Sequence, residues 1–230
     1  DTPEQRVGKY QDDRPWESCI TICHQWAWKP EDEMKSLKEC LQTLIRCAGG
    51  DGNLLFNVGP MPDGRIEPRQ VERLREMGTW LGKYGETIYG TRGGPFKPGK
   101  WGASTRKDET VYLHVFDSPT NVFTLPPLNQ KLVSGTALTG GQADVRQTAE
   151  GISVRISSSN RQTISTIIAL KFEGTVMDLP AAGLGGGSLT EGAKATASNV
   201  FERDPHYAAS AAVDGDDETR WATDSGTRQA

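Results

Sequence analysis

Two glutamates and a cluster of aromatic residues lie within the first 28 residues of the chain. Glu4 stands twelve residues before the dipeptide Trp16-Glu17. A carboxyl group beside apolar surface has a raised pKa and can act as an acid near neutrality. By spacing alone, Glu4 is more simply explained as a solvated terminal residue. Glu17 enters a predicted strand at its N-terminal end, where side chains usually serve stability.

The segment from His24 to Trp28 follows the C-terminal end of the same predicted strand. Enzymes built on parallel α/β barrels bind substrate at that end. The faces of Trp26 and Trp28 suit the apolar face of a sugar, and His24 can donate a hydrogen bond. Core packing by both tryptophans is an equally good explanation. Asn57, near the end of a second predicted strand, either hydrogen-bonds the neighbouring loop or reaches the same pocket.

An acidic segment near the C-terminus holds Asp214, Asp216 and Thr219 within six residues. Ca²⁺ prefers several carboxylate, carbonyl and hydroxyl oxygens around a tight turn. The segment is too short for an EF-hand loop, which spreads its ligands over about twelve residues. It is therefore either a calcium site of another kind or an acidic surface turn.

The four cysteines are Cys19, Cys23, Cys40 and Cys47. Their spacing differs from that of a zinc site, and the two members of each local pair are too far apart for a disulfide. We expect reduced thiols, and a bond between the first pair and the second stays open.

The residues around these groups follow strand and helix patterns in turn up to about residue 95. Residues 19–23 and 53–58 are short apolar runs that predict two buried strands. Between them, Pro30 opens a predicted helix that Gly49-Gly50 ends. A second helix is predicted to turn four side chains inward: Val71, Leu74, Leu81 and Ile88. Strand, helix, strand and helix with short loops indicate parallel α/β architecture.

From about residue 96 the hydrophobic pattern alternates, as in strands. Short strand patterns between turn clusters predict a small antiparallel β-sandwich over residues 96–180. Residues 181–188 predict a Gly-rich linker. Residues 189–230 form a third segment that is too short to bury a core alone.

The charge balance narrows the range of partners. Lys and Arg number 26 and Asp and Glu 30, for a net charge of −4. Without a basic run the chain is not expected to bind nucleic acid. No apolar stretch approaches the roughly 20 residues that span a bilayer. The chain begins without Met or a leader and ends after what resembles the start of a domain, so we expect a fragment of a longer protein.

Three motifs, in order, carry a resemblance to a known family: residues 15–22 (PWESCITI), residues 26–28 (WAW) and residues 52–60 (GNLLFNVGP), the last followed by Asp63-Gly64. Residues 1–95 resemble the C-terminal half of the barrel of α-L-fucosidases in glycoside hydrolase family 29. Residues 96–180 are similar in pattern to that family's C-terminal β-sandwich. Residues 189–230 resemble the start of a discoidin-like carbohydrate-binding module of family 32, in which Asp214, Asp216 and Thr219 match ligands of a structural calcium.

The resemblance implies a multi-domain fold: the C-terminal part of a (β/α)8-type barrel, an antiparallel β-sandwich and a truncated discoidin-like β-sandwich. It implies a retaining mechanism with two carboxyl groups. Glu4 best matches the acid/base and Glu17 is the second choice, while the nucleophilic Asp is expected upstream of this chain. His24, Trp26, Trp28 and Glu17 are the expected substrate-binding residues.

The expected function is therefore that of an α-L-fucosidase acting on a fucosylated oligosaccharide or glycoconjugate, with no cofactor for catalysis. The Trp26-Ala27-Trp28 motif differs from the Trp-Gly-Tyr of broad-specificity members and favours branched α-1,3/1,4-fucosides. The chain alone is expected to be inactive, and the family implies an extracellular or periplasmic location. The alternative is a non-catalytic carbohydrate-binding protein.

Overall fold

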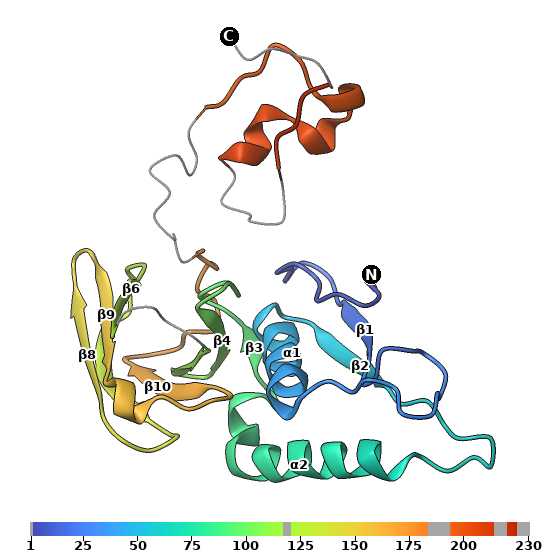
Figure 1. Ribbon diagram of the computed structural model, residues 1–230. Coiled ribbons are helices and arrows are strands. Elements are labelled where there is room, and N and C mark those ends of the chain that lie inside the picture. The colour runs from blue at the N-terminus through green and yellow to red at the C-terminus, as the bar shows by residue number, and fades with distance from the viewer. Residues whose placement is uncertain (1, 117–120, 184–193, 214–219, 225–230) are drawn as a thin grey trace. The chain divides into compact units, whose positions relative to one another are not determined.

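The computed structural model describes residues 2–116, 121–183, 194–213 and 220–224. The chain divides into two compact units, Asp1–Leu184 and Gly185–Ala230 (Figure 1). The predicted α/β region and the predicted sandwich region both belong to the first unit. No helix in the described ranges is both long enough and apolar enough to cross a membrane.

The first unit begins with a small parallel sheet. Strands β1 (Glu17–Thr21) and β2 (Asn53–Asn57) pair in parallel, with Glu17 opposite Asn53 and Thr21 opposite Asn57. Helix α1 (Leu37–Gly49) connects them, and α2 (Pro68–Tyr84) follows β2 (Figure 1). The parallel order of strand, helix, strand and helix is as predicted. The described residues contain no closed barrel.

The sequence pattern predicts a helix that starts at Pro30, but helix α1 begins at Leu37. The hydroxyl of Ser36 accepts a hydrogen bond from the Glu39 amide, and the Glu39 carboxylate accepts one from the Ser36 amide at 2.7 Å. This capping box satisfies two backbone donors that an uncapped helix start leaves unpaired. Glu31 has a φ of 55°, which a right-handed helix cannot contain. The residues before Ser36 therefore form a loop.

The buried side chains of α2 are Gln70, Met77 and Trp80, and Leu74 is 38% exposed. The sequence predicts four inward-facing side chains on this helix: Val71, Leu74, Leu81 and Ile88. The prediction is wrong at Leu74. Ile88 lies beyond the helix, after the short 3-10 turn Gly85–Thr87. The large ring of Trp80 sets the rotation of the helix, because it packs with Met77 into the core that α2 shares with α1.

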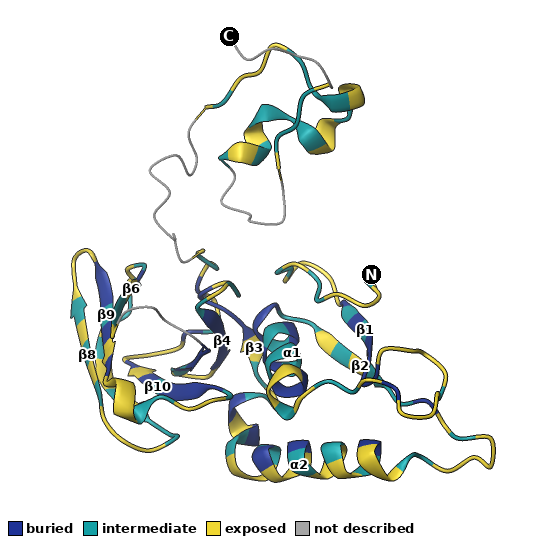
Figure 2. Ribbon diagram, in the orientation of Figure 1, coloured by how far each residue is buried: buried dark blue, intermediate teal, exposed yellow. Residues whose placement is uncertain are grey.

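Strand β2 is not buried as predicted. Leu55 is 50% exposed, whereas Phe56 packs against the core of α1 and α2. Strand β2 has no stretch in the dark blue of buried residues in Figure 2. Successive side chains of a strand point to opposite faces. One face of β2 is therefore covered by helices, and no described segment covers the other.

Two antiparallel sheets form the rest of the first unit. The larger has the order β3 (Arg92–Gly93), β4 (Gly102–Lys107), β5 (Thr110–Val115), β10 (Thr166–Phe172) and β7 (Leu132–Ala137). The smaller has the order β6 (Val122–Leu125), β9 (Gly151–Ile156) and β8 (Ala143–Thr148). Side chains of both sheets share one hydrophobic core, which includes Leu113, Leu125, Val154 and Leu170. Strands β4, β9 and β10 are mostly dark blue in Figure 2, whereas β8 is not.

A second core joins the sheets to the helical part. Phe116 and Ile167 pack with Leu41 and Ile45 of α1. Gln42 of α1 also donates a hydrogen bond to the carbonyl of Ile164, at 2.8 Å. The α/β part and the sheets therefore support each other, which explains why they form one compact unit.

The described part of the second unit consists of short 3-10 turns, Phe201–Arg203, Pro205–Tyr207 and Ala209–Ala212. The rings of Phe201 and Tyr207 meet edge to face at 5.4 Å, and Arg220 lies over the Tyr207 ring. Residues 194–213 and 220–224 contain no strand. Asp214, Asp216 and Thr219 lie outside the described residues, and the discoidin-like module stays a prediction.

Candidate active site

Glu4 lies beside β1. The Cys19 amide donates to the carbonyl of Pro3, and the Gln5 amide donates to the carbonyl of Cys19, both at 2.9 Å. Glu4 and Cys19 therefore form a parallel bridge. On the other side of β1, Leu55 is the register partner of Cys19. The segment around Glu4 thus extends the parallel sheet by one strand position.

The register assigns Glu4 to one face of this sheet. Ile20 and Phe56 are register partners, and Phe56 packs against the helices. Because side chains alternate along a strand, Cys19, Leu55 and Glu4 belong to the opposite face. We call this the open face. In barrel enzymes built from parallel strands, substrate binds at the carboxyl ends of the strands.

Glu17 belongs to the open face as well, but two residues before Cys19 and so nearer the N-terminal end of β1. Two residues of a strand correspond to about 6.6 Å. Glu4, level with Cys19, therefore lies nearer the carboxyl end than Glu17 does. Glu4 is exposed and Glu17 is half-buried.

The segment His24–Trp28 forms a loop after β1, and its two tryptophans differ. Trp26 is 42% exposed, while Trp28 is half-buried and its backbone lies against Gly59, where no side chain intervenes. His24 is exposed, and its Nδ1 is 3.1 Å from the amide nitrogen of the Gln25 side chain. Trp26 and His24 are thus more accessible to a ligand than Trp28 is.

Three hydrogen bonds hold this loop. The Gln25 amide donates to Oδ2 of Asp32 at 2.8 Å, and the His24 amide donates to the carbonyl of Glu33 at 2.9 Å. The side-chain amide of Asn57 donates to the carbonyl of Trp26 at 3.0 Å. Of the two alternatives for Asn57, the structure therefore shows the bond to the loop. Asp32 was missed by the sequence pattern, which assigns it to the first turn of a helix.

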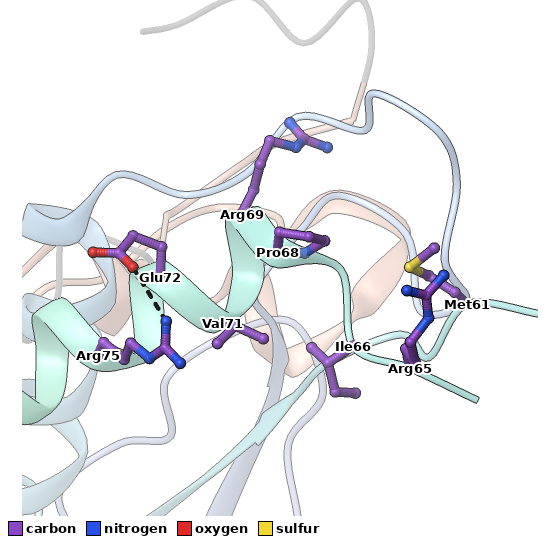
Figure 3. Close-up of a pocket in the computed structure, with 8 residues that line it drawn as sticks. All are labelled: Met61, Arg65, Ile66, Pro68, Arg69, Val71, Glu72 and Arg75. Atoms are coloured by element: carbon purple, nitrogen blue, oxygen red, sulfur yellow. Dashed lines mark ion pairs between the residues drawn. The ribbon is translucent and has the colours of Figure 1, made fainter. Parts of the chain in front are cut away.

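A pocket of about 710 Å³ lies at the start of α2 (Figure 3). Its lining consists of Met61, Arg65, Ile66, Pro68, Arg69, Val71, Glu72 and Arg75. Arg75 pairs with Glu72 at 3.7 Å, and Arg65 and Arg69 pair with neighbouring carboxylates outside the lining. The arginine charges are thus compensated. None of the residues predicted for the site lines this pocket.

The three buried cysteines, Cys23, Cys40 and Cys47, are poorly suited to act as nucleophiles, because burial raises the pKa of each thiol. All four are described, and none forms a disulfide. Burial, together with the negative charges of Asp32 and Glu67, raises the pKa of the Cys23 thiol, so the reactive thiolate is disfavoured. Among the described residues, no three His, Cys, Asp or Glu side chains come together as a metal site.

Comparison with known proteins identifies the region that contains Glu4, β1 and β2. The family model described as Alpha-L-fucosidase matches residues 1–86. Residues 1–86 are therefore similar to the α-L-fucosidase family. The antiparallel sheets lie outside that match.

Individual α-L-fucosidases match further along the chain. An α-L-fucosidase of Branchiostoma floridae is 35% identical over 156 residues, which cover 54% of this chain and 33% of that protein. A plasma α-L-fucosidase of Rattus norvegicus is 31% identical over 175 residues, covering 72% of this chain and 34% of that protein. The chain therefore spans about a third of the length of these relatives.

Among solved structures, α-L-fucosidase isoenzyme 1 from Paenibacillus thiaminolyticus is similar with a TM-score of 0.66 and 27% identity. The similarity covers 75% of this chain and 44% of that one. This coverage exceeds residues 1–86, so part of the antiparallel sheets of this chain also resembles a fucosidase structure.

Proposed function

We propose that this chain is the part of an α-L-fucosidase that carries the acid/base carboxylate, Glu4, and that the complete enzyme releases L-fucose from fucosylated glycans. The observation that carries the proposal is the parallel bridge between Glu4 and Cys19, which assigns Glu4 to the open face. The match of residues 1–86 to the family model described as Alpha-L-fucosidase supports the reaction class.

The proposed mechanism retains the configuration at the anomeric carbon. A carboxylate outside this chain attacks that carbon while Glu4 donates its proton to the leaving oxygen and the glycosidic C–O bond breaks. Glu4 then takes a proton from water as the water attacks the same carbon and releases the first carboxylate. Because the covalent step needs that carboxylate, we infer that the 230-residue chain alone is inactive.

The proposed substrate contacts are made by the side chains of the loop after β1 that are exposed. The accessible ring of Trp26 offers a face to a sugar, and His24 offers a hydrogen bond to a hydroxyl group. We infer that Trp28 and Glu17 support the site from half-buried positions. Branched α-1,3/1,4-linked fucosides, an extracellular or periplasmic location and a structural calcium near Asp214 remain parts of the proposal.

The test is the release of fucose by the full-length protein that carries this chain. We expect the full-length protein to cleave an aryl α-L-fucoside, its Glu4→Gln variant to be impaired, and the isolated 230-residue chain to release none. Fucose release by the isolated chain would overturn the inference that this chain alone is inactive. Glycan binding by a full-length protein that hydrolyses no fucoside would favour a carbohydrate-binding protein instead.

A further inference from the structure

Two hydrogen bonds bracket the dipeptide Gln25-Trp26. Asp32 accepts from the amide of Gln25 at 2.8 Å, and Asn57 donates to the carbonyl of Trp26 at 3.0 Å. The first bond fixes the peptide unit before Gln25, and the second fixes the peptide unit after Trp26. The backbone on both sides of the exposed Trp26 ring is therefore tied to the frame.

Both anchors, Asp32 and Asn57, are connected to regular secondary structure. Asn57 is the last residue of β2 and pairs in register with Thr21 of β1. Asp32 is 6% exposed, and its own carbonyl accepts a hydrogen bond from the guanidinium of Arg69 on α2, at 3.3 Å. The loop is thus connected to β2 through one anchor and to α2 through the other.

The chemistry of the two bonds makes them hard to replace. A buried carboxylate is costly unless a donor satisfies it, and the Gln25 amide is that donor. At the other end, the acceptor is a carbonyl oxygen, so only a donor such as the amide nitrogen of Asn57 can serve. Removing either partner leaves a polar group unpaired and frees the loop.

We propose that Asp32 and Asn57 are positioning residues that preset the exposed Trp26 ring at the carboxyl ends of the strands for a sugar ring of the glycan substrate. This inference rests on the proposed fucosidase function. A loop that is ordered before binding avoids the entropy cost of ordering during binding. Loss of an anchor should therefore weaken substrate binding more than it slows the chemical step.

The first test is hydrogen exchange of the 230-residue chain, measured by mass spectrometry. Asp32→Ala and Asn57→Asp should each speed exchange in peptides that cover residues 24–28 by about tenfold or more, because local opening becomes easier. Peptides from α1 should keep their protection. Glu33→Ala is the matched control, because it removes an exposed carboxylate from the same loop without removing either bond. Unchanged exchange at residues 24–28 in both variants would overturn the proposal.

The second test is the kinetics of the full-length protein with a fucosylated oligosaccharide. Asn57→Asp, which replaces the donor by an acceptor of the same shape, should raise KM about tenfold and leave kcat within about twofold. Asp32→Asn keeps an acceptor oxygen and should stay near the wild type, whereas Asp32→Ala should resemble Asn57→Asp. In a Trp26→Ala background, Asn57→Asp should add almost nothing, because it acts through that ring.

The outcomes separate the two proposals. Equal losses from Asn57→Asp with and without Trp26 would overturn the positioning role while the fucosidase function stands. A loss of kcat alone, with KM unchanged, would do the same. A wild-type protein that releases no fucose would instead overturn the proposed function, and the exchange experiment would still report on the two anchors.

Discussion

Glu4 and Cys19 lie side by side in parallel register, although fifteen residues separate them in the chain. The bridge assigns the Glu4 carboxylate to the sheet face that also carries Leu55, which is half exposed. A carboxylate on that face and an accessible Trp26 just beyond the end of β1 support the proposed site, which also needs a second carboxylate from outside this chain. Backbone pairing places the Glu4 carboxylate, and the side chains of Asp32 and Asn57 hold the loop that carries the exposed ring.

The first prediction concerns Glu4→Gln in the full-length protein. The kcat for a fucosylated oligosaccharide should fall by about 10²- to 10⁴-fold, because its leaving group needs a proton. An aryl fucoside with an acidic phenol should lose less in the first step. Added azide, which needs no general base, should restore turnover and give a fucosyl azide of retained configuration. Steady-state kinetics and NMR of the product are the measurements.

Glu17→Gln is the matched control for that experiment, because Glu17 belongs to the same face two residues nearer the N-terminal end of β1. Its kcat should stay within about tenfold of the wild type, and azide should have no effect. Azide rescue of Glu17→Gln, with none for Glu4→Gln, would exchange the two assignments.

How far the site can be predicted from sequence depends on the range of each interaction. The loop after β1, with His24 and Trp26, follows from local strand and loop patterns. The role of Asp32 cannot be predicted from such patterns. Its partner is the backbone amide of Gln25, and nearly every residue carries a backbone amide. The register of Glu4 with Cys19 likewise arises from backbone hydrogen bonds and carries no side-chain signature. The family motifs supply what the local pattern lacks.

The second prediction concerns Gly59, which lies under the loop. A Cβ atom added there would come within 2.5 Å of the Trp28 backbone nitrogen. Gly59→Ala should therefore destabilise the chain by more than about 1 kcal/mol and shift the loop. Gly82→Ala on α2 is the control, since a Cβ there meets nothing within 4 Å, and it should stabilise by up to about 1 kcal/mol. Urea denaturation of both variants distinguishes them, and equal midpoints would contradict the prediction.

The third prediction concerns the start of α1. Ser36→Ala removes the hydroxyl that caps the helix and should cost about 1 kcal/mol of unfolding free energy. Hydrogen bonds from Ser36 hold the pKa of Glu39 below its ordinary value. That contribution is present above the unfolded-state pKa of Glu39 and is lost as pH falls through the lower folded-state pKa. The cost of Ser36→Ala should thus shrink in acid, which denaturation at pH 7 and pH 3 would show.

The fold was predictable where the pattern is local and strong. The parallel strands, the two helices and the alternation after residue 96 follow from hydrophobic period. The predicted start of α1 was wrong, because Pro30 and the acidic residues after it have the composition of a first helical turn. The capping box of Ser36 and Glu39 is the stronger signal, and the helix begins there. The exposure of Leu55 could not be predicted, because it depends on what covers the strand and not on the strand itself.

The last prediction concerns His114, which lies on β5 and is fully buried. Its ring is 6.4 Å from that of Trp80, and its Nδ1 is 3.4 Å from the hydroxyl of Ser165. Burial lowers the pKa of His114 to about 4, although the nearby backbone of Thr87 opposes the change. In the unfolded chain a histidine pKa is about 6.5.

The sign of the pH effect follows from these two values. Between about pH 6.5 and pH 4 the unfolded chain holds a proton on this imidazole and the folded chain does not, so the free energy of unfolding falls as pH falls. His114→Phe should flatten that slope, and His114→Gln is the second variant if the phenyl ring does not fit. The controls are His206→Gln, which removes an exposed imidazole from the second unit, and the wild type. Urea denaturation from pH 4 to pH 7 measures the slope. A slope that stays the same in both His114 variants would contradict the burial of a neutral imidazole, because no other fully buried histidine is present among the described residues.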